Sequence, residues 1–435
     1  MRICFVADAR SPIARNWIEH FIRRGDEVHV ISSYPCPPDI LPGAQVYPVP
    51  MYFSSLSRVG HDGTIAGAGQ RRTSSLVRPL LAQLRTGPLS GAAHFVLIRV
   101  LAPFEILRHV GPVRARIAQI APDLVHAMRI PFEGIVAAKA TPPAYPLITS
   151  VWGNDFTLFA MRHIVIRRQT QQVLNRTDAL HCDCARDLRI ADEWGFDAAR
   201  PRIVLPGAGG LQRDRFYPGP GNSALAGRFA IPPGAPVIIN PRGFRGYVRN
   251  DVFFKAIPRV LEAQPAAIFA CSGTQGNPTA EKWVRELGIG ASVRLLPPVS
   301  RDEMADLFRL AQITVSPSTH DGTPNTLLEA MACGCFPIAG DIESLREWIA
   351  DGENGLLCDP ADPKTLAEAI IRALQDAPLR ERARAHNQRL IDERAEYGAV
   401  MAQAEAFYAE MVAPRRATAG GEKVFSRAGQ QGGVS

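Results

Sequence analysis

The sequence predicts an α/β protein built from two Rossmann-like domains, each with a doubly wound parallel sheet. The chain has 435 residues, which is more than one core of ordinary size requires. Short apolar runs alternate with longer amphipathic stretches, and this alternation occurs in two series. A Pro- and Gly-rich segment, 206–234, separates the series and predicts the hinge.

The first series begins directly at the N-terminus. Its apolar periodicity predicts, in order, strand 2–7, helix 12–24, strand 27–32, strand 123–127, helix 131–140, strand 146–151, helix 157–176, strand 179–182, helix 185–194 and strand 202–205. Gly25 follows the first helix as a stop signal. Strands that alternate with helices in this way form parallel sheets.

The second series repeats this pattern. It predicts strands 236–240, 267–272, 292–295 and 312–316, and helices 253–263, 280–287, 301–310, 324–333, 344–350 and 363–387. A last long helix ends at residue 412, and the polar, Gly-rich residues after it predict disorder. The expected organisation is an N-terminal domain 1–208, a C-terminal domain 219–390, a helix 391–412 and a disordered tail 413–435.

Composition narrows the class of protein. Hydrophobic residues make up 46% and charged residues 21%, as in globular proteins. Met1 leads directly into an apolar strand, and no apolar run reaches the ~18 residues of a membrane-spanning helix. The eight cysteines lack paired zinc-ligand spacing and are interpreted as reduced, buried thiols. We therefore expect a cytoplasmic protein.

One basic segment accounts for the net charge of +7. Residues 71–116 contain eight arginines and a single acid, Glu105, interleaved with apolar residues. We expect an insertion at about 54–116 that either contacts an anionic membrane at its inner face or forms a solvated helical region. Nucleic acid is not expected as a partner, because no nucleic-acid-binding motif accompanies the charge.

The most informative segment follows the predicted strand 312–316. Ligands of open parallel sheets bind beyond the carboxyl ends of the strands, and the loop there carries Asp321. Pro324 is expected as the first helical residue with Thr323 as its cap, so that the free amides of Asn325 and Thr326 form an anion site.

Glu329 lies among apolar residues of the same predicted helix. A buried carboxylate without a partner is costly. Two partners remain open: the hydroxyls of a ligand, or a local arginine in a salt bridge.

This segment resembles the signature of retaining glycosyltransferases of the GT-B fold, the large family four type also described as glycosyl transferases group 1. The signature has two acids separated by seven residues, here Asp321 and Glu329, and then Ala-Met-Ala-x-Gly; Asp replaces the commoner Glu at the first position. Further blocks resemble the family in order, at 336–338, 341–347, 351–357, and in the N-terminal half at 2–32, 122–126, 151–155 and 209–218.

The resemblance implies two Rossmann-like domains that face each other across a cleft, with the last helix crossing back to the first domain. It implies transfer of a sugar from a UDP- or GDP-sugar donor to an acceptor hydroxyl with retention, in cell-envelope polysaccharide or glycolipid synthesis, on a glycan or lipid-linked acceptor. We expect no metal and no cofactor, because amide dipoles and arginines can neutralise the leaving diphosphate.

The resemblance also implies residue roles. The catalytic candidates are Asp321, which contacts hydroxyls of the transferred sugar, and His126, which lies near the sugar. The donor-binding candidates are Arg242, Arg249, Gly322, Thr323, Pro324, Asn325, Thr326 and Glu329, the last of which contacts the ribose. The family's Arg…Lys pair lacks its lysine here, and Arg249 is a better positional substitute than Arg245.

The N-terminal half is less regular. Met128 stands where many members have a second histidine, so His126 has an alternative interpretation as a packed or hydrogen-bonded core residue. Arg10 and Ser11 are candidates for donor or acceptor contact, and Asn154 and Asp155 for the cleft wall. Two rival functions remain: a sugar-nucleotide epimerase of related fold, and a non-catalytic nucleotide-sugar-binding partner subunit.

Overall fold

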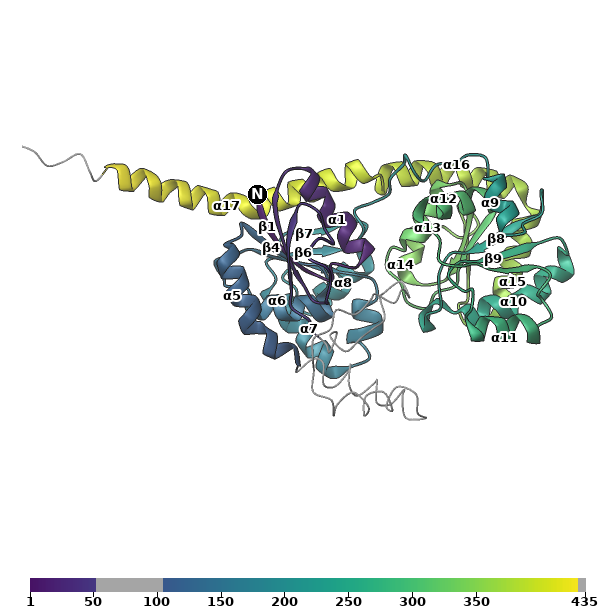
Figure 1. Ribbon diagram of the computed structural model, residues 1–435, viewed down its shortest axis with the longest axis horizontal. Coiled ribbons are helices and arrows are strands. Elements are labelled where there is room, and N and C mark those ends of the chain that lie inside the picture. Colours follow the sequence, from purple (N-terminus) through teal and green to yellow (C-terminus); the bar gives the residue numbers. More distant parts are fainter. Residues whose placement is uncertain (52–104, 429–435) are drawn as a thin grey trace, which may run out of the picture. The chain divides into compact units, whose positions relative to one another are not determined.

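The computed structural model describes residues 1–51 and 105–428, with side chains as far as residue 413. The chain divides into two compact units (Figure 1). Unit 1 comprises Met1–Cys182, Arg189–Val204 and Met401–Ser435, and unit 2 comprises Asp183–Leu188 and Leu205–Val400. The larger part of the basic insertion expected at about 54–116 lies outside the described residues.

Unit 1 has a seven-stranded parallel sheet within the described part of the chain, in the order β3-β2-β1-β4-β5-β6-β7. The strands are β1 (Arg2–Ala7), β2 (Glu27–Ser32), β3 (Ala44–Pro48), β4 (Leu124–Ala127), β5 (Leu147–Val151), β6 (Ala179–Cys182) and β7 (Arg202–Val204). Phe5 of β1 lies opposite Val30 of β2 and His126 of β4. The central strands are almost wholly buried, which explains why they are continuous apolar runs rather than alternating ones.

The helices of unit 1 alternate with its strands. They are α1 (Pro12–Arg23), α5 (Val110–Ile120), α6 (Ile135–Ala140), α7 (Ile164–Arg176) and, from Arg189 onward, α8 (Ala185–Glu193), with shorter turns η3 (Ile106–His109), η4 (Ile130–Gly134) and η5 (Asp155–Ala160). The single helix predicted at 157–176 is therefore two elements, the π-helical turn η5 and α7. Ser11 caps α1, since its side chain accepts a hydrogen bond from the amide of Ala14.

The long helix α17 (Tyr397–Ala428) joins unit 1 from Met401 onward. Its Tyr408 is buried and accepts a hydrogen bond from Trp17 Nε1 at 2.9 Å. The helix continues past residue 412, where the sequence suggested that it ends. In the portion of the chain that can be described, none of the helices combines the length and the apolar character that crossing a membrane requires.

Unit 2 has a six-stranded parallel sheet among its described residues, in the order β10-β9-β8-β11-β12-β13. The strands are β8 (Val237–Asn240), β9 (Ile268–Cys271), β10 (Val293–Leu295), β11 (Ile313–Ser316), β12 (Phe336–Gly340) and β13 (Leu356–Cys358). The helical elements are α9 (Ser223–Arg228), η6 (Gly246–Val248), α10 (Asn250–Ala263), α11 (Pro278–Glu286), α12 (Arg301–Leu310), α13 (Asn325–Ala332), α14 (Glu343–Arg346), α15 (Pro363–Gln375) and α16 (Ala377–Arg394).

One predicted helix of unit 2, 363–387, is in fact two. Asp376 ends α15 and caps α16, because its carboxylate accepts a hydrogen bond from the amide of Leu379 at 2.8 Å. Pro378 suits the first turn of the new helix, where its missing N–H costs nothing. The prediction of an α/β protein with two doubly wound parallel sheets is confirmed.

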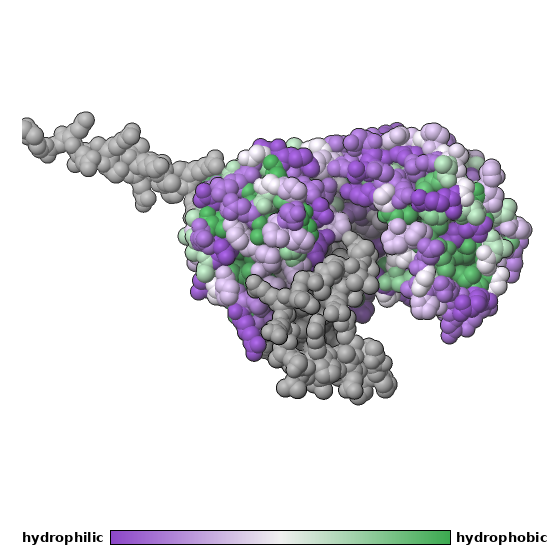
Figure 2. Space-filling view, in the orientation of Figure 1, coloured by the Kyte–Doolittle hydropathy of each residue, from purple (hydrophilic) through white to green (hydrophobic). Residues whose placement is uncertain are grey.

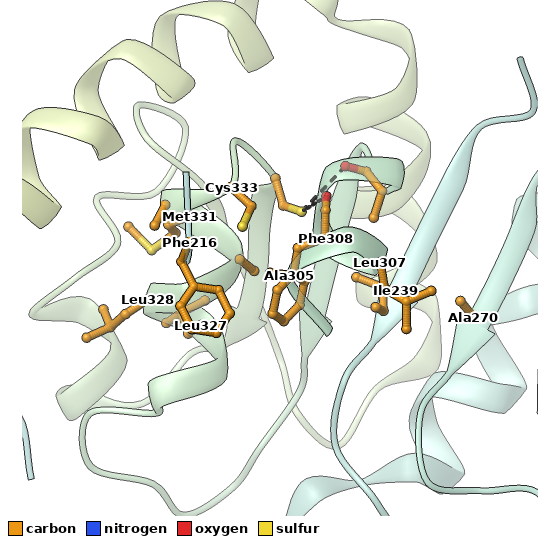
Figure 3. Packing of buried hydrophobic residues seen from close by; sticks show 14 of the residues in the cluster. Phe216, Ile239, Ala270, Ala305, Leu307, Phe308, Leu327, Leu328, Met331 and Cys333 are labelled. Atoms are coloured by element: carbon orange, nitrogen blue, oxygen red, sulfur yellow. Dashed lines mark hydrogen bonds between the residues drawn. The ribbon is translucent and has the colours of Figure 1, made fainter. Parts of the chain in front are cut away.

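The buried apolar residues of unit 2 form separate clusters, and neighbouring residues of a strand belong to different clusters. Ile238 belongs to one cluster and Ile239 to the other. In the second cluster, Leu327 and Met331 of α13 are buried together with Phe308 of α12 (Figure 3). The burial of these apolar side chains fixes helix α13, which sets the position of the loop before it.

The visible surface of the described residues is mostly polar, with apolar residues in scattered patches (Figure 2).

Candidate functional site

The candidate site of unit 2 lies at the point where its strand order reverses. Strand β8 has β9 on one side and β11 on the other, so successive strands extend from this point in opposite directions. Loops that leave the carboxyl ends of such neighbouring strands form the usual binding crevice of an open α/β sheet. Here the loop after β8 carries Arg242, and the loop after β11 carries Asp321.

Arg242 and Asp321 meet at this point. Nη1 of Arg242 donates to the carboxylate of Asp321 and, at 3.1 Å, to Oγ of Ser318. The exposed fractions of the two charged side chains are only 13% and 9%. The structure thus brings together two residues that the family resemblance assigned to donor binding and catalysis, and their charges are largely shielded from water.

Two buried asparagines fix the loop that carries Arg242. Asn240 donates through Nδ2 to Oδ1 of Asn250 at 3.0 Å, and its own Oδ1 accepts from the amide of Arg242 at 3.2 Å. Asn250 also donates to the carbonyl of Gly243 at 3.4 Å. This role has no signal in the sequence, because a pair of asparagines has no distinctive local pattern.

Arg249 and Arg245, the two arginines that could replace the missing lysine, both form side-chain hydrogen bonds within the protein. Nε and Nη2 of Arg249 each donate to the carboxylate of Asp251 at 2.9 Å, and Arg249 itself has a positive φ of 58°. Nη1 of Arg245 donates to the hydroxyl of Tyr247 at 3.1 Å. The positive charge of Arg249 is therefore already paired with Asp251 in this structure.

The start of α13 differs from the prediction by one residue. Pro324, with φ −72° and ψ 117°, is the N-cap rather than the first helical residue, and no side chain caps the helix. Thr323 is not the cap: its hydroxyl donates to the carbonyl of Asp183 and accepts from Trp348 Nε1 at 3.1 Å.

This geometry leaves the first amides of α13 available. Within the described residues, no hydrogen bond occupies the backbone N–H of Asn325 or Thr326. The N-terminus of a helix carries a partial positive charge, and its free amides bind anions. The expected anion site is therefore geometrically possible, although its cap was misassigned.

The backbone of the Asp321 loop is held from within unit 2. The carbonyl of Asp321 accepts hydrogen bonds from Arg186 Nη1 at 2.6 Å and from Ser344 Oγ at 2.8 Å. At Gly322, a Cβ would lie 2.4 Å from both carboxylate oxygens of Asp183, so a side chain would require a shift there. Neither the hydrogen bonds to the Asp321 carbonyl nor the close approach at Gly322 involves the Asp321 carboxylate. That carboxylate is therefore available to pair with Arg242.

Glu329 pairs with an arginine in this structure. Nη2 of Arg301, the first residue of α12, donates to Oε1 of Glu329 at 2.9 Å. Of the two partners that the sequence left open, the local arginine is the one observed. Burial raises the pKa of Glu329 to about 7, and Arg301 acts in the opposite direction. Arg301 itself was missed, because an arginine at a helix start has no signal in the sequence that links it to Glu329.

His126 is a core residue. It has no exposed surface, Nδ1 is hydrogen-bonded to the hydroxyl of Tyr408, and Nε2 lies 2.7 Å from Oγ of Ser150. Ser150 in turn contacts Nδ1 of His181 at 2.8 Å. Burial, with a smaller contribution from His181, holds the pKa of His126 well below its usual value. Both ring nitrogens already have protein partners, which favours the core interpretation, and the catalytic role of His126 stays a prediction.

The other candidates of unit 1 have distinct positions. Arg10 donates from Nε and Nη2 to Asp8 at 3.0 and 3.1 Å and lies 4.0 Å from the centre of the Tyr34 ring. Ser11 serves as the cap of α1. Asn154 precedes η5 without a side-chain capping bond.

Asp155 is wholly buried and ties two loops together. Its carboxylate accepts from Arg129 Nε at 2.9 Å, from the amide of Trp152 at 3.0 Å and from the amide of Ile130 at 3.3 Å. It therefore joins the loop after β4 to the loop after β5. These protein partners explain how the Asp155 carboxylate can be buried, and no ligand is needed for that explanation.

One group of described residues has the composition of a metal site. Ligand atoms of Asp183, Cys184 and Asp187 all lie within 4.8 Å of one another. However, the Asp187 carboxylate is paired with Arg186 at 2.7 Å, which already supplies a positive charge. We assign no metal to this group.

Comparisons with known sequences agree with the motifs at this site. Residues 224–389 match the profile of the family described as Glycosyl transferases group 1, so the resemblance is confirmed for this part of the chain. The D-inositol 3-phosphate glycosyltransferase of Corynebacterium urealyticum is 30% identical over 221 residues, which cover 47% of this chain and 50% of that protein. The protein of the same name from Geodermatophilus obscurus is 31% identical over 211 residues, 46% of each. The chain thus spans about half the length of the curated relatives it matches.

Solved structures show the fold. Sucrose-phosphate synthase from Thermosynechococcus elongatus is similar with a TM-score of 0.71 at 15% identity, covering 95% of this chain and 100% of that one. The Anabaena protein HepE in complex with UDP and glucose gives 0.67 at 14% identity, covering 94% and 100%. These similarities confirm the GT-B class of two Rossmann-like domains.

Proposed function

We propose that this chain, whose residues 224–389 match the group 1 glycosyl transferases, transfers a sugar from a nucleotide diphosphate donor to an acceptor hydroxyl. Unit 2 binds the donor in this proposal. The observation that carries it is the Arg242–Asp321 pair at the strand-order reversal of unit 2, in the same unit as the free amides of α13.

Each part of this arrangement suits one part of a sugar nucleotide. The amides of Asn325 and Thr326, with Arg242, offer positive charge to the diphosphate. Asp321 accepts hydrogen bonds from hydroxyls of the sugar, and Glu329 from the ribose. Binding then requires Arg242 and Arg301 to share or exchange their present carboxylate partners.

Catalysis in this proposal rests on stabilising the leaving diphosphate. Negative charge develops on its oxygens as the glycosidic bond breaks, and fixed N–H groups stabilise such charge without reorganisation. The mechanism proposed is retaining: the acceptor attacks the same face that the diphosphate leaves, and a donor phosphate oxygen takes the proton of the acceptor hydroxyl. No step in this mechanism requires a metal ion.

The acceptor is proposed to belong to cell-envelope polysaccharide or glycolipid synthesis. The support is the basic composition of residues 71–116, of which Arg108 and Arg114 are described and exposed. Liposome sedimentation tests the membrane part. Binding to anionic vesicles should weaken when Arg71, Arg72 and Arg78 are changed to Gln, and unchanged binding would contradict it.

The experiment that tests the activity is a donor screen followed by product analysis. Thermal stabilisation by UDP, GDP and their sugars identifies the donor, because a ligand that binds only the folded state raises Tm. The transfer reaction is then followed with and without an acceptor. Donor isomerisation without acceptor would support an epimerase instead, and donor binding without turnover would support a non-catalytic subunit. Product NMR that shows inversion at the anomeric carbon would contradict the retaining mechanism.

A further inference from the structure

The sheet of unit 1 also reverses its strand order, and charged residues gather at that point. Strand β1 has β2 on one side and β4 on the other. The loop after β1 carries Asp8 and Arg10, and the segment after β4 carries Arg129 and Glu133. Unit 1 thus has charged groups where an open α/β sheet binds its ligands.

Arg129 is held rigidly, yet its terminal N–H groups have no hydrogen-bond partner among the described residues. Nε donates to Asp155 at 2.9 Å, and the guanidinium carbon lies 5.1 Å from the ring centres of Phe132 and Phe159. The side chain is 23% exposed. Across residues 1–51 and 105–413, no hydrogen bond to either terminal nitrogen is found. A fixed guanidinium with free donors matches the two oxygens of a phosphate or carboxylate.

Glu133 lies one helical turn further along the chain and has an oxygen without a partner. The residue is 4% exposed, and Oε1 accepts a hydrogen bond from Ser33 Oγ at 2.5 Å. Oε2 is buried and has no hydrogen-bond partner among the described residues. Buried polar atoms of native proteins are nearly always bonded, so an orphaned oxygen at a strand-order reversal points to a missing donor group.

Electrostatic interactions indicate that the charged groups of both segments lie near Tyr34. Burial and the carboxylates of Glu133 and Asp8 raise the pKa of Tyr34. Arg10 and Arg129 act in the opposite direction. Tyr34 therefore has two acids and two arginines around it. Burial raises the pKa of Glu133 to about 7, so this carboxyl is partly neutral at pH 7 and repels an anion less than an ordinary glutamate does.

We propose that Arg129 and Glu133 form the acceptor subsite, and that the acceptor carries an anionic group near a free hydroxyl. This inference rests on the proposed function. The terminal N–H groups of Arg129 bind the phosphate or carboxylate of the acceptor. Oε2 of Glu133 accepts a hydrogen bond from one of its hydroxyls, which orients the polyol. Glu133 is assigned to acceptor binding only, with no proton transfer.

A purely structural role for Arg129 is the alternative. Its ion pair with Asp155 alone would hold the loops after β4 and β5 together. That role needs only Nε, and it does not explain the free oxygen of Glu133. The two roles differ in what they predict for an anionic ligand, so the test measures ligand binding apart from stability.

The test uses the full-length chain with R129K and E133Q. Lysine keeps the charge beside Asp155 but cannot bind an anion through two parallel N–H groups. R167K is the matched control, because Arg167 is also a unit 1 arginine over an aromatic ring, 4.8 Å from the centre of Trp194, but is exposed. Thermal melting verifies that each variant is folded.

Binding is measured by calorimetry without donor, using inorganic phosphate, D-inositol 3-phosphate and neutral inositol as probes, and vesicles of phosphatidylglycerol as a fourth. We expect R129K to weaken an anionic probe about tenfold, which corresponds to about 1.4 kcal/mol, and R167K to leave it unchanged. E133Q should weaken D-inositol 3-phosphate but not inorganic phosphate. Arg129-dependent binding of the soluble probes assigns a free phosphorylated acceptor, and such binding of vesicles alone assigns a lipid headgroup.

The proposal is overturned if no anionic probe binds in an Arg129-dependent way, or if a folded R129K variant binds each of them like the wild type. The result is separable from the proposed function. A protein that binds the phosphorylated probe through Arg129 but turns over no sugar nucleotide would contradict the proposed function and leave this anion site standing. The converse result is a protein that turns over a sugar nucleotide while R129K leaves the kinetics for the acceptor unchanged. That result would leave the proposed function standing and contradict this anion site.

Discussion

Arg242 and Asp321, 79 residues apart in the chain, form a largely buried ion pair between the loops that follow β8 and β11. A buried arginine needs a carboxylate partner, and here the partner is a residue that the family signature assigns to the sugar. The pair thus fixes the position of the guanidinium. We propose that a sugar diphosphate replaces or shares this partner, which would link donor binding to the order of both loops.

We expect Arg242→Ala to reduce kcat/KM for the donor by about 100-fold or more, the usual effect of removing one fixed donor to developing negative charge. Arg259→Ala is the matched control, since it breaks an exposed pair with Glu368 on α10 and α15 of the same unit. Steady-state kinetics on folded variants checks this. Equal activity of the two variants would remove Arg242 from the site.

Asn250→Ala should loosen the loop that carries Arg242. The change removes the partner of Asn240 Nδ2, and an unsatisfied buried amide costs about 1–3 kcal/mol of stability. We also expect a higher KM for the donor, because Asn240 holds the amide of Arg242.

Asn222→Ala separates these two effects. It removes the cap of α9, a bond from Leu225 N to Asn222 Oδ1 at 3.1 Å, and so costs stability in the same unit. The donor KM should stay unchanged in this variant. A KM that rises equally in both variants would show that general loss of stability is responsible.

Glu329 predicts a pH dependence of stability. Its pKa is raised to about 7 in the folded protein, so between pH 4.5 and 7 the folded state binds more protons than the unfolded state. The stability from this group is therefore fully present below pH 4.5 and is lost as the pH rises through 7. Relative to Glu329→Gln, the wild type should lose about 2–3 kcal/mol between pH 5 and pH 8. Urea unfolding at both pH values checks this, and a constant difference would show that Arg301 keeps the carboxylate ionised throughout.

Tyr408→Phe tests the core role of His126. Removal of the hydroxyl leaves Trp17 Nε1 and His126 Nδ1 without their buried partner, which should lower stability by about 1–3 kcal/mol. The donor KM should remain that of the wild type, because these residues belong to unit 1. A large change in donor kinetics with little loss of stability would instead indicate a catalytic function for this group.

The sequence determined the features that depend on local periodicity. Two series of alternating strands and helices predicted two parallel sheets, because buried strands and amphipathic helices impose different spacings on apolar residues. The acids at 321 and 329, followed by Ala-Met-Ala-x-Gly, indicated the loop and helix of the candidate site through their resemblance to the family signature. Both features lie within short segments, where spacing along the chain specifies geometry.

The tertiary structure decided which side chains meet. Strand order places the loop of Arg242 beside that of Asp321, and the packing of α12 and α13 gives Glu329 its partner Arg301. His126 is buried by Tyr408, 282 residues later in the sequence. The physical reason is the same in each case: partners that are distant in sequence are selected by sheet topology and close packing, which no local pattern of residues records.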